Sequence, residues 1–175
     1  MDVWGSTAAE RAASFPCDPL IGPGDHILYR AVDVAAPAEL VFRWICQLRT
    51  APYSYDCIDN FGKRSPHHLT PGLDELASGQ RVMTIFRLVS FEEGRSITVQ
   101  SDTTWFGRVV VSYVAEPTHS DRTRLLVKLA FRRPPGISGW IRGKILPVGD
   151  LVMMRKQLLT LKTLAERDAR SGSTI

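Results

Sequence analysis

The stretch GDLVMMRKQLLTLKTLAERDAR, residues 149–170, decides the fold of this chain. Its apolar side chains recur at alternating steps of three and four residues, the spacing of one helical face, at Leu151, Met154, Leu158, Leu161 and Ala165. The pattern predicts an amphipathic helix from Gly149 to about Arg170. Such a helix needs a large apolar partner, and an antiparallel sheet with one inward apolar face is the partner that the rest of the chain can supply.

Strand patterns precede this helix. Residues 123–131 show the clearest alternation of apolar and polar side chains, and residues 81–88, 96–102 and 105–115 alternate as well. We interpret residues 81–88 as one strand and expect a solvated outer face on the sheet. The side chains that we expect on the inward face are Val82, Phe86, Leu88, Ile97, Val99, Ser101, Trp105, Val109, Val111, Tyr113, Leu125, Val127, Leu129 and Phe131.

The chain begins differently from this meander. Residues 1–25 are interpreted as an N-terminal extension with one short helix around residues 7–14. Residues 26–34 are rich in strand formers, and Pro37 then opens a helix that runs to about Arg49. Residues 50–79 are turn-rich. The sequence therefore predicts an α+β fold, with one domain at 26–170 and a disordered tail at 171–175.

This order of elements, with segments 32–44, 52–60 and 149–155, resembles the START-like, or SRPBCC, superfamily of hydrophobic-ligand-binding and polyketide cyclase-like proteins. The resemblance covers about residues 26–168 and implies a helix-grip fold, in which a curved sheet wraps a long C-terminal helix. Relatives of this kind often carry a Trp where Cys57 stands. The superfamily includes carriers, receptors and cyclases, so the fold leaves the function open.

A cavity between the sheet and the final helix is the expected site in such a fold. The side chains that we expect to line it are Phe86, Trp105, Val109, Tyr113, Leu125, Val127, Leu129, Met154, Leu158 and Leu161. The alternative is that these residues form a filled core.

A polar and aromatic cluster in the loop after the first helix supplies the candidate catalytic groups Tyr53, Tyr55 and Asp56. Tyrosines near a carboxylate can exchange protons with a polyketide-like carbonyl. The alternative is structural, because Asp caps local backbone and tyrosines cover the edge of a core. If the protein is an enzyme, we expect a cyclase- or dehydratase-like lyase without a metal; we favour a protein that is not an enzyme.

Other chemical motifs are weak. His67 and His68 are adjacent and point apart, so we expect no metal site, and we expect no cofactor. Cys46 is interpreted as a small core residue. Arg30 and Arg87 are expected on the solvated face of the sheet; if either is buried, Asp33, Glu92 or an acidic ligand would be its partner.

Composition limits the class of protein. The 175 residues are 44% hydrophobic and 23% charged with a net charge of +4, which excludes a disordered chain. Three widely spaced cysteines indicate reduced thiols, and no secretory signal or membrane span is recognised, so we expect a cytoplasmic protein. The basic residues concentrate in Arg132–Lys156.

Three functions compete. We favour binding or carriage of a small hydrophobic molecule in the cavity. The alternatives are a cyclase- or dehydratase-like enzyme, and an adaptor that contacts a membrane or protein surface through Arg132–Lys156. We expect no nucleic-acid partner, and the sequence leaves the oligomeric state and the ligand unknown.

Overall fold

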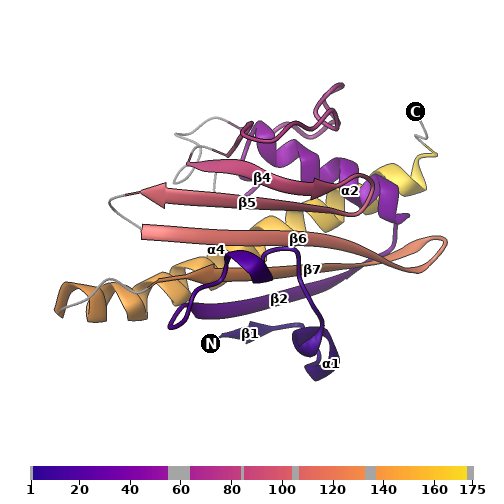
Figure 1. The fold of residues 1–175 in the computed structure, drawn as a ribbon. Coiled ribbons are helices and arrows are strands. Elements are labelled where there is room, and N and C mark those ends of the chain that lie inside the picture. Colours follow the sequence, from indigo (N-terminus) through magenta and orange to yellow (C-terminus); the bar gives the residue numbers. More distant parts are fainter. Residues whose placement is uncertain (1, 55–63, 84, 104–106, 133–136, 173–175) are drawn as a thin grey trace.

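The computed structural model describes residues 2–54, 64–83, 85–103, 107–132 and 137–172, with the backbone alone at 102–103 and 137–151. Figure 1 shows the order of the elements. The elements are β1 (Val3–Trp4), α1 (Ala8–Ala12), the 3₁₀ helix η1 (Asp18–Leu20), β2 (His26–Val34), α2 (Ala38–Cys46), the 3₁₀ helix η2 (Gln47–Arg49), β3 (Arg81–Val82), β4 (Phe86–Glu92), β5 (Ser96–Thr103), β6 (Gly107–His119), β7 (Arg122–Phe131) and α4 (Ile137–Arg170).

The strands form one sheet in the order β1-β2-β7-β6-β5-β4-β3. All neighbouring strands are antiparallel except β1, which runs parallel to β2. Helices α2 and α4 cover one face, and the N-terminal segment crosses the other (Figure 1). The α+β helix-grip fold expected from the sequence is therefore confirmed. No helix in the described part of the chain is long and apolar enough to cross a membrane.

The inward face predicted for the sheet matches the main core. Leu88, Val99, Val111, Leu125 and their neighbours pack there with the apolar stripe of α4 and with α2. Helix α2 is tied to α4 by a buried hydrogen bond, in which Trp44 Nε1 donates to Asp168 Oδ2 over 3.1 Å. The strand predicted at residues 26–34 is β2, and the helix predicted to begin at Pro37 is α2, which η2 continues.

Residues 81–88 do not form the single strand that we expected. Val82 pairs with Phe86 and Arg81 with Arg87, so the segment folds back as a hairpin. Met83 has φ of 51°, in the left-handed region, where the chain reverses. Alternation alone cannot distinguish a straight strand from a tight reversal, because Val82, Phe86 and Leu88 fall on the core side in either case.

Helix α4 is longer than the predicted 149–170 and begins at Ile137. The added turns contain Gly143, Pro147 and Gly149, although glycine and proline are poor residues for a helix interior. The backbone is helical through all three positions. The N-terminal half of α4 runs past the end of the sheet (Figure 1).

The outer face of the sheet is covered over β2, β6 and β7, so the expectation of a solvated face is wrong for these three strands. Phe15 and Cys17, from the N-terminal segment, form a second core with Val110 and Val114 of β6. Lys128 of β7 is buried beside them and pairs with Asp18 at 2.5 Å. Residues 2–25 are thus packed on the sheet as one of its layers.

Candidate ligand-binding site

The inner face of the sheet is built from cross-strand rows. The register places His26 opposite Phe131, Phe131 opposite Val109, and Val109 opposite Ser101. Phe86 continues this row, because the next residue, Arg87, pairs with Gln100. We call these five residues the end row. It lies where β6 begins and β7 ends.

The end row is less enclosed than the row beside it. His26, Val109 and Phe86 are only partly buried. The neighbouring row is closed, with exposed fractions of 7% or less at Leu28, Leu129, Val111, Val99 and Leu88. Apolar surface is therefore left accessible at one end of an otherwise packed interior, on the side along which the N-terminal half of α4 continues (Figure 1).

Ser101 brings a polar atom into the end row. Its side chain is 3% exposed, and its hydroxyl has no hydrogen-bond partner among the described residues. It shares the inner face with Ile97 and Val99, which belong to the main core. A buried hydroxyl without a partner costs free energy, so one that persists marks a place where a further group can bind.

Arg30 lies on the inner face and is 1% exposed, contrary to the expectation of a solvated position. Its Nη1 donates to the backbone carbonyls of Asp2 and Tyr29, at 2.9 Å each. The carboxylates expected to partner a buried Arg30 bond to other arginines: Asp33 pairs with Arg124 and Glu92 with Arg95. Arg87 is exposed, as expected.

Tyr113, on the inner face of β6, is the first member of a series of hydrogen bonds that crosses the interior. Its hydroxyl donates to Gln157 Oε1 over 2.8 Å, and Gln157 Nε2 donates to the carbonyl of Pro52 over 2.6 Å. Gln157 is 4% exposed. The sheet, α4 and the loop after η2 are thus joined by buried hydrogen bonds, which fix the wall of the interior at this point.

Of the other residues expected to line a cavity, some are packed in the main core and others lie in the end row or beside it. Leu125, Val127, Leu158 and Leu161 are at most 1% exposed and are packed inside the main core. Leu129 and Met154 are 7% and 8% exposed; Leu129 lies in the row next to the end row, and Met154 contacts the Tyr113 hydroxyl. Phe86 and Val109 belong to the end row itself. Trp105 lies outside the described residues.

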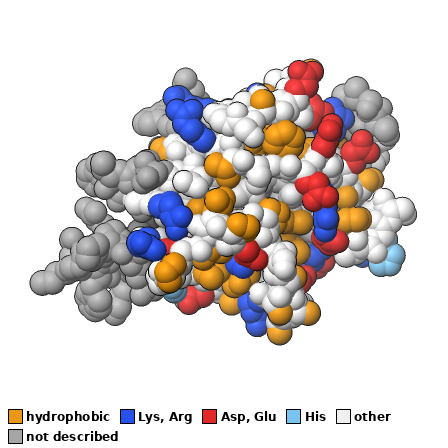
Figure 2. All heavy atoms as spheres, viewed as in Figure 1, with side chains coloured by type: hydrophobic (Ala, Val, Ile, Leu, Met, Phe, Trp, Pro, Cys, Tyr) orange, Lys and Arg blue, Asp and Glu red, His pale blue; other side chains and the backbone are white. Residues whose placement is uncertain are grey.

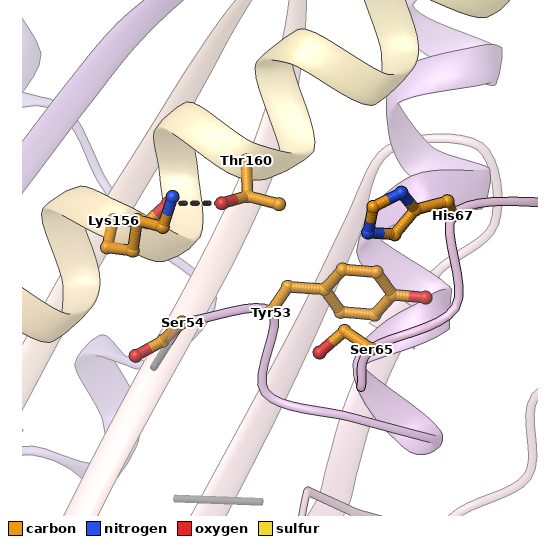
Figure 3. A pocket seen from close by; sticks show the side chains of 6 residues that line it. All are labelled: Tyr53, Ser54, Ser65, His67, Lys156 and Thr160. Atoms are coloured by element: carbon orange, nitrogen blue, oxygen red, sulfur yellow. Dashed lines mark hydrogen bonds between the residues drawn. The ribbon is translucent and has the colours of Figure 1, made fainter. Parts of the chain in front are cut away.

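Tyr53 lines a different pocket, of about 120 Å³, on the flank of α4. We call it the flank pocket; its residues are Tyr53, Ser54, Ser65, His67, Lys156 and Thr160 (Figure 3). Lys156 and Thr160 lie on a different side of α4 from the stripe that carries Met154, Leu158 and Leu161. Tyr55 and Asp56, the other two catalytic candidates, lie outside the described residues.

The two described cysteines are unsuited to nucleophilic chemistry. Burial raises the pKa of Cys46 to about 12 and also raises that of Cys17. Both thiols are therefore protonated at neutral pH. Among the described residues, no three His, Cys, Asp or Glu side chains could hold a metal ion together.

Three cations of the basic segment Arg132–Lys156 have described side chains, and their surroundings differ. Arg132 pairs with Asp25, Arg155 lies over the ring of Trp4, and Lys156 lines the flank pocket. Contact of this segment with a membrane stays a prediction.

Comparison with known proteins defines the class by fold alone. No protein-family model and no curated protein matches the sequence. Among solved structures, the chain is similar to the Zhui aromatase/cyclase of Streptomyces sp. R1128, at a TM-score of 0.58 and 17% identity over 86% of this chain and 99% of that one. A structure from Thermobifida fusca matches at 0.52 and 17% identity, over 82% and 93% of the two chains. The chain thus shares its helix-grip fold with these two solved proteins.

Sequence reasoning missed Arg30 and Gln157 as interior groups. Residues 26–34 carry apolar side chains on both faces, so the side on which Arg30 points could not be read from alternation. Gln157 lies beside the apolar stripe of α4, and nothing in its spacing distinguishes it from a solvated residue. Ser101 was placed on the inner face, but only the register shows that it neighbours Val109 and Phe86.

Proposed function

We propose that this protein binds a small hydrophobic molecule between the end row of the sheet and the N-terminal half of α4. The observation that carries the proposal is the partly buried apolar surface of Phe86 and Val109 beside the buried Ser101 hydroxyl, which bonds to no described residue. Ligand sites are mostly apolar with a few placed polar groups, and the end row has this composition.

The ligand suited to this row is an apolar body with at least one hydrogen-bonding group. The apolar body would cover Val109 and Phe86, which removes their exposed surface from water. A carbonyl or hydroxyl of the ligand would bond to Ser101 and so remove the cost of its unpaired hydroxyl.

Equilibrium dialysis with a long-chain fatty acid and with a polycyclic phenol tests this proposal. We expect saturable binding of at least one of the two by the wild-type chain, and at least a tenfold loss in Val109→Trp, because the indole would fill the accessible end. Val89→Trp is the matched control, since Val89 is 37% exposed on β4. Unchanged binding by Val109→Trp, or no saturable binding by the wild type, would contradict the proposal.

The cyclase or dehydratase alternative stays a prediction. It was based on Tyr53, Tyr55 and Asp56, and Tyr53 lines the flank pocket instead of the inner face of the sheet. Turnover of a confirmed substrate that survives both Tyr55→Phe and Asp56→Asn would exclude these loop residues as its acid and base.

A further inference from the structure

The flank pocket lies apart from the end row and shares no residue with it. Figure 3 shows Lys156 and Thr160 reaching it from α4, with Ser65 and His67 on either side of the Tyr53 ring. Its volume of about 120 Å³ has room for a small group and none for a polycyclic or long-chain molecule. Its ligand must therefore differ from the one proposed for the interior.

Two hydrogen bonds, one of them buried, hold the walls of the flank pocket in place. Gln157 binds the carbonyl of Pro52 just before Tyr53, and Arg167 binds the carbonyl of His67 over 2.6 Å. Tyr53 is 1% exposed and has φ of 54°, a left-handed conformation that costs free energy in a tyrosine. Its ring packs edge-on against Trp44, with centroids 6.0 Å apart. The pocket is thus formed without a ligand.

The charge of the flank pocket favours an anion. Its six described lining residues include the cation of Lys156 and the imidazole of His67, and none of these six is a carboxylate. Lys156 forms no ion pair with a described residue. The two carboxylates with described side chains on α4 are engaged elsewhere, Glu166 with Lys162 and Asp168 with Arg167.

The remaining lining groups are hydroxyls on separate elements. Ser54 follows Tyr53, Ser65 precedes His67 by two residues, and Thr160 lies one turn after Lys156 on α4. Thr160 Oγ1 already donates to the backbone carbonyl of Lys156 over 2.8 Å (Figure 3). A serine hydroxyl offers one donor and two acceptor lone pairs, so Ser54 and Ser65 are the hydroxyls that can bond to an oxyanion. Donors that approach from different sides suit a tetrahedral anion better than a planar carboxylate.

We infer that the flank pocket binds a phosphate group, either free or as part of a small phosphorylated molecule. Lys156 supplies the charge, and the serine hydroxyls and His67 supply hydrogen bonds. The site is independent of the proposed interior ligand, because no residue of the end row lines the flank pocket.

Calorimetric titration at fixed ionic strength with inorganic phosphate, glycerol 3-phosphate and acetate tests this inference. We expect saturable binding of a phosphate compound and at least a tenfold loss in Lys156→Gln. Arg155→Gln is the control, because it removes the same charge one residue away, where the side chain lies over Trp4. Binding of both phosphates would indicate free phosphate, and binding of glycerol 3-phosphate alone would indicate a phosphorylated molecule.

Three results would overturn the inference: no saturable phosphate binding, an equal loss in both variants, or tighter binding of acetate. Failure here leaves the dialysis experiment on Val109→Trp unaffected, so the two proposals can fail separately.

Discussion

At the scale of single residues, Ser101 connects the packing of the sheet to ligand binding. A serine hydroxyl at 3% exposure without a described partner lowers the stability of the empty protein. A small apolar side chain at position 101 would fill the same space without the free-energy cost of a buried hydroxyl.

We therefore predict that Ser101→Ala leaves the free energy of unfolding unchanged or raises it by about 1 kcal/mol, because it deletes a buried polar atom and creates little cavity. Urea denaturation of the ligand-free protein measures this change. Thr98→Ala is the contrast: its hydroxyl bonds to that of Ser112 over 2.7 Å, so its loss should destabilise. A loss of more than about 1 kcal/mol in Ser101→Ala would show that this hydroxyl has a partner in the folded protein.

Arg30 shows, at the same scale, what the sequence could not predict. Strand β2 packs against the main core on one side and against Phe15 and its neighbours on the other. Its two faces are therefore both apolar, and period-two alternation is lost. The face on which Arg30 lies could therefore not be read from alternation, because the N-terminal segment that makes the outer face of β2 apolar comes from an earlier part of the chain.

At the scale of elements, the N-terminal segment depends on a glycine. Gly5 has φ of 75°, and a Cβ there would lie 2.1 Å from the carbonyl oxygen of Ala31 on β2. No other residue allows the chain to leave β1 so close to β2 without movement of one of them.

Gly5→Ala should destabilise the protein by about 2 kcal/mol or more, since left-handed strain and a backbone clash add together. Gly24→Ala is the matched control, because Gly24 has φ of 82° and open space around it. It should show the strain alone, near 1 kcal/mol. Thermal unfolding of both variants measures the difference, and equal melting temperatures would show that β1 is not held against β2.

Asp25 ties the end of the same segment to two strands. It pairs with Arg108 at 2.8 Å and with Arg132 at 3.1 Å, next to the start of β6 and the end of β7. Burial alone raises the pKa of Asp25, but the backbone N–H of Gly22 and the two guanidinium groups outweigh it, so the pKa lies below its ordinary value of 3.8.

The sign of the pH dependence follows from this lowered pKa. The interactions of Asp25 stabilise the fold above about pH 3.8 and are lost as the pH falls through the lower pKa of the folded state. Asp25→Asn should cost about 1–3 kcal/mol at pH 7, with the difference from wild type shrinking below pH 3.8. Urea denaturation across this range, with the exposed turn residue Asp121→Asn as control, measures it. A pH-independent difference would show that the charge of Asp25 contributes nothing.

At the scale of the whole molecule, the order of elements and the inward face of the meander were predictable, because apolar alternation and helical spacing record which side faces the core. The reversal at Met83 and the helical start of α4 at Ile137 were not predictable. Both run against local preferences, since glycine and proline disfavour a helix interior and a methionine seldom adopts a left-handed backbone conformation.

The candidate site was predictable to a lesser degree. Val109 and Phe86 were expected to line a cavity, yet the same reasoning included Leu125 and Leu158, which are packed inside the core. Whether a residue has an odd or an even position in a strand tells which face of the sheet its side chain joins. Only the pairing register between strands tells how near that side chain lies to the end row, where the interior is accessible.

The most direct test of the proposed ligand is mass spectrometry of small molecules that copurify with the native protein. We predict that an apolar molecule with a hydrogen-bonding group is released from the wild-type chain and from Val89→Trp, and is absent from Val109→Trp. Equal recovery from all three proteins, or a wild-type protein that neither carries such a molecule nor takes one up when it is added, would contradict binding at the end row.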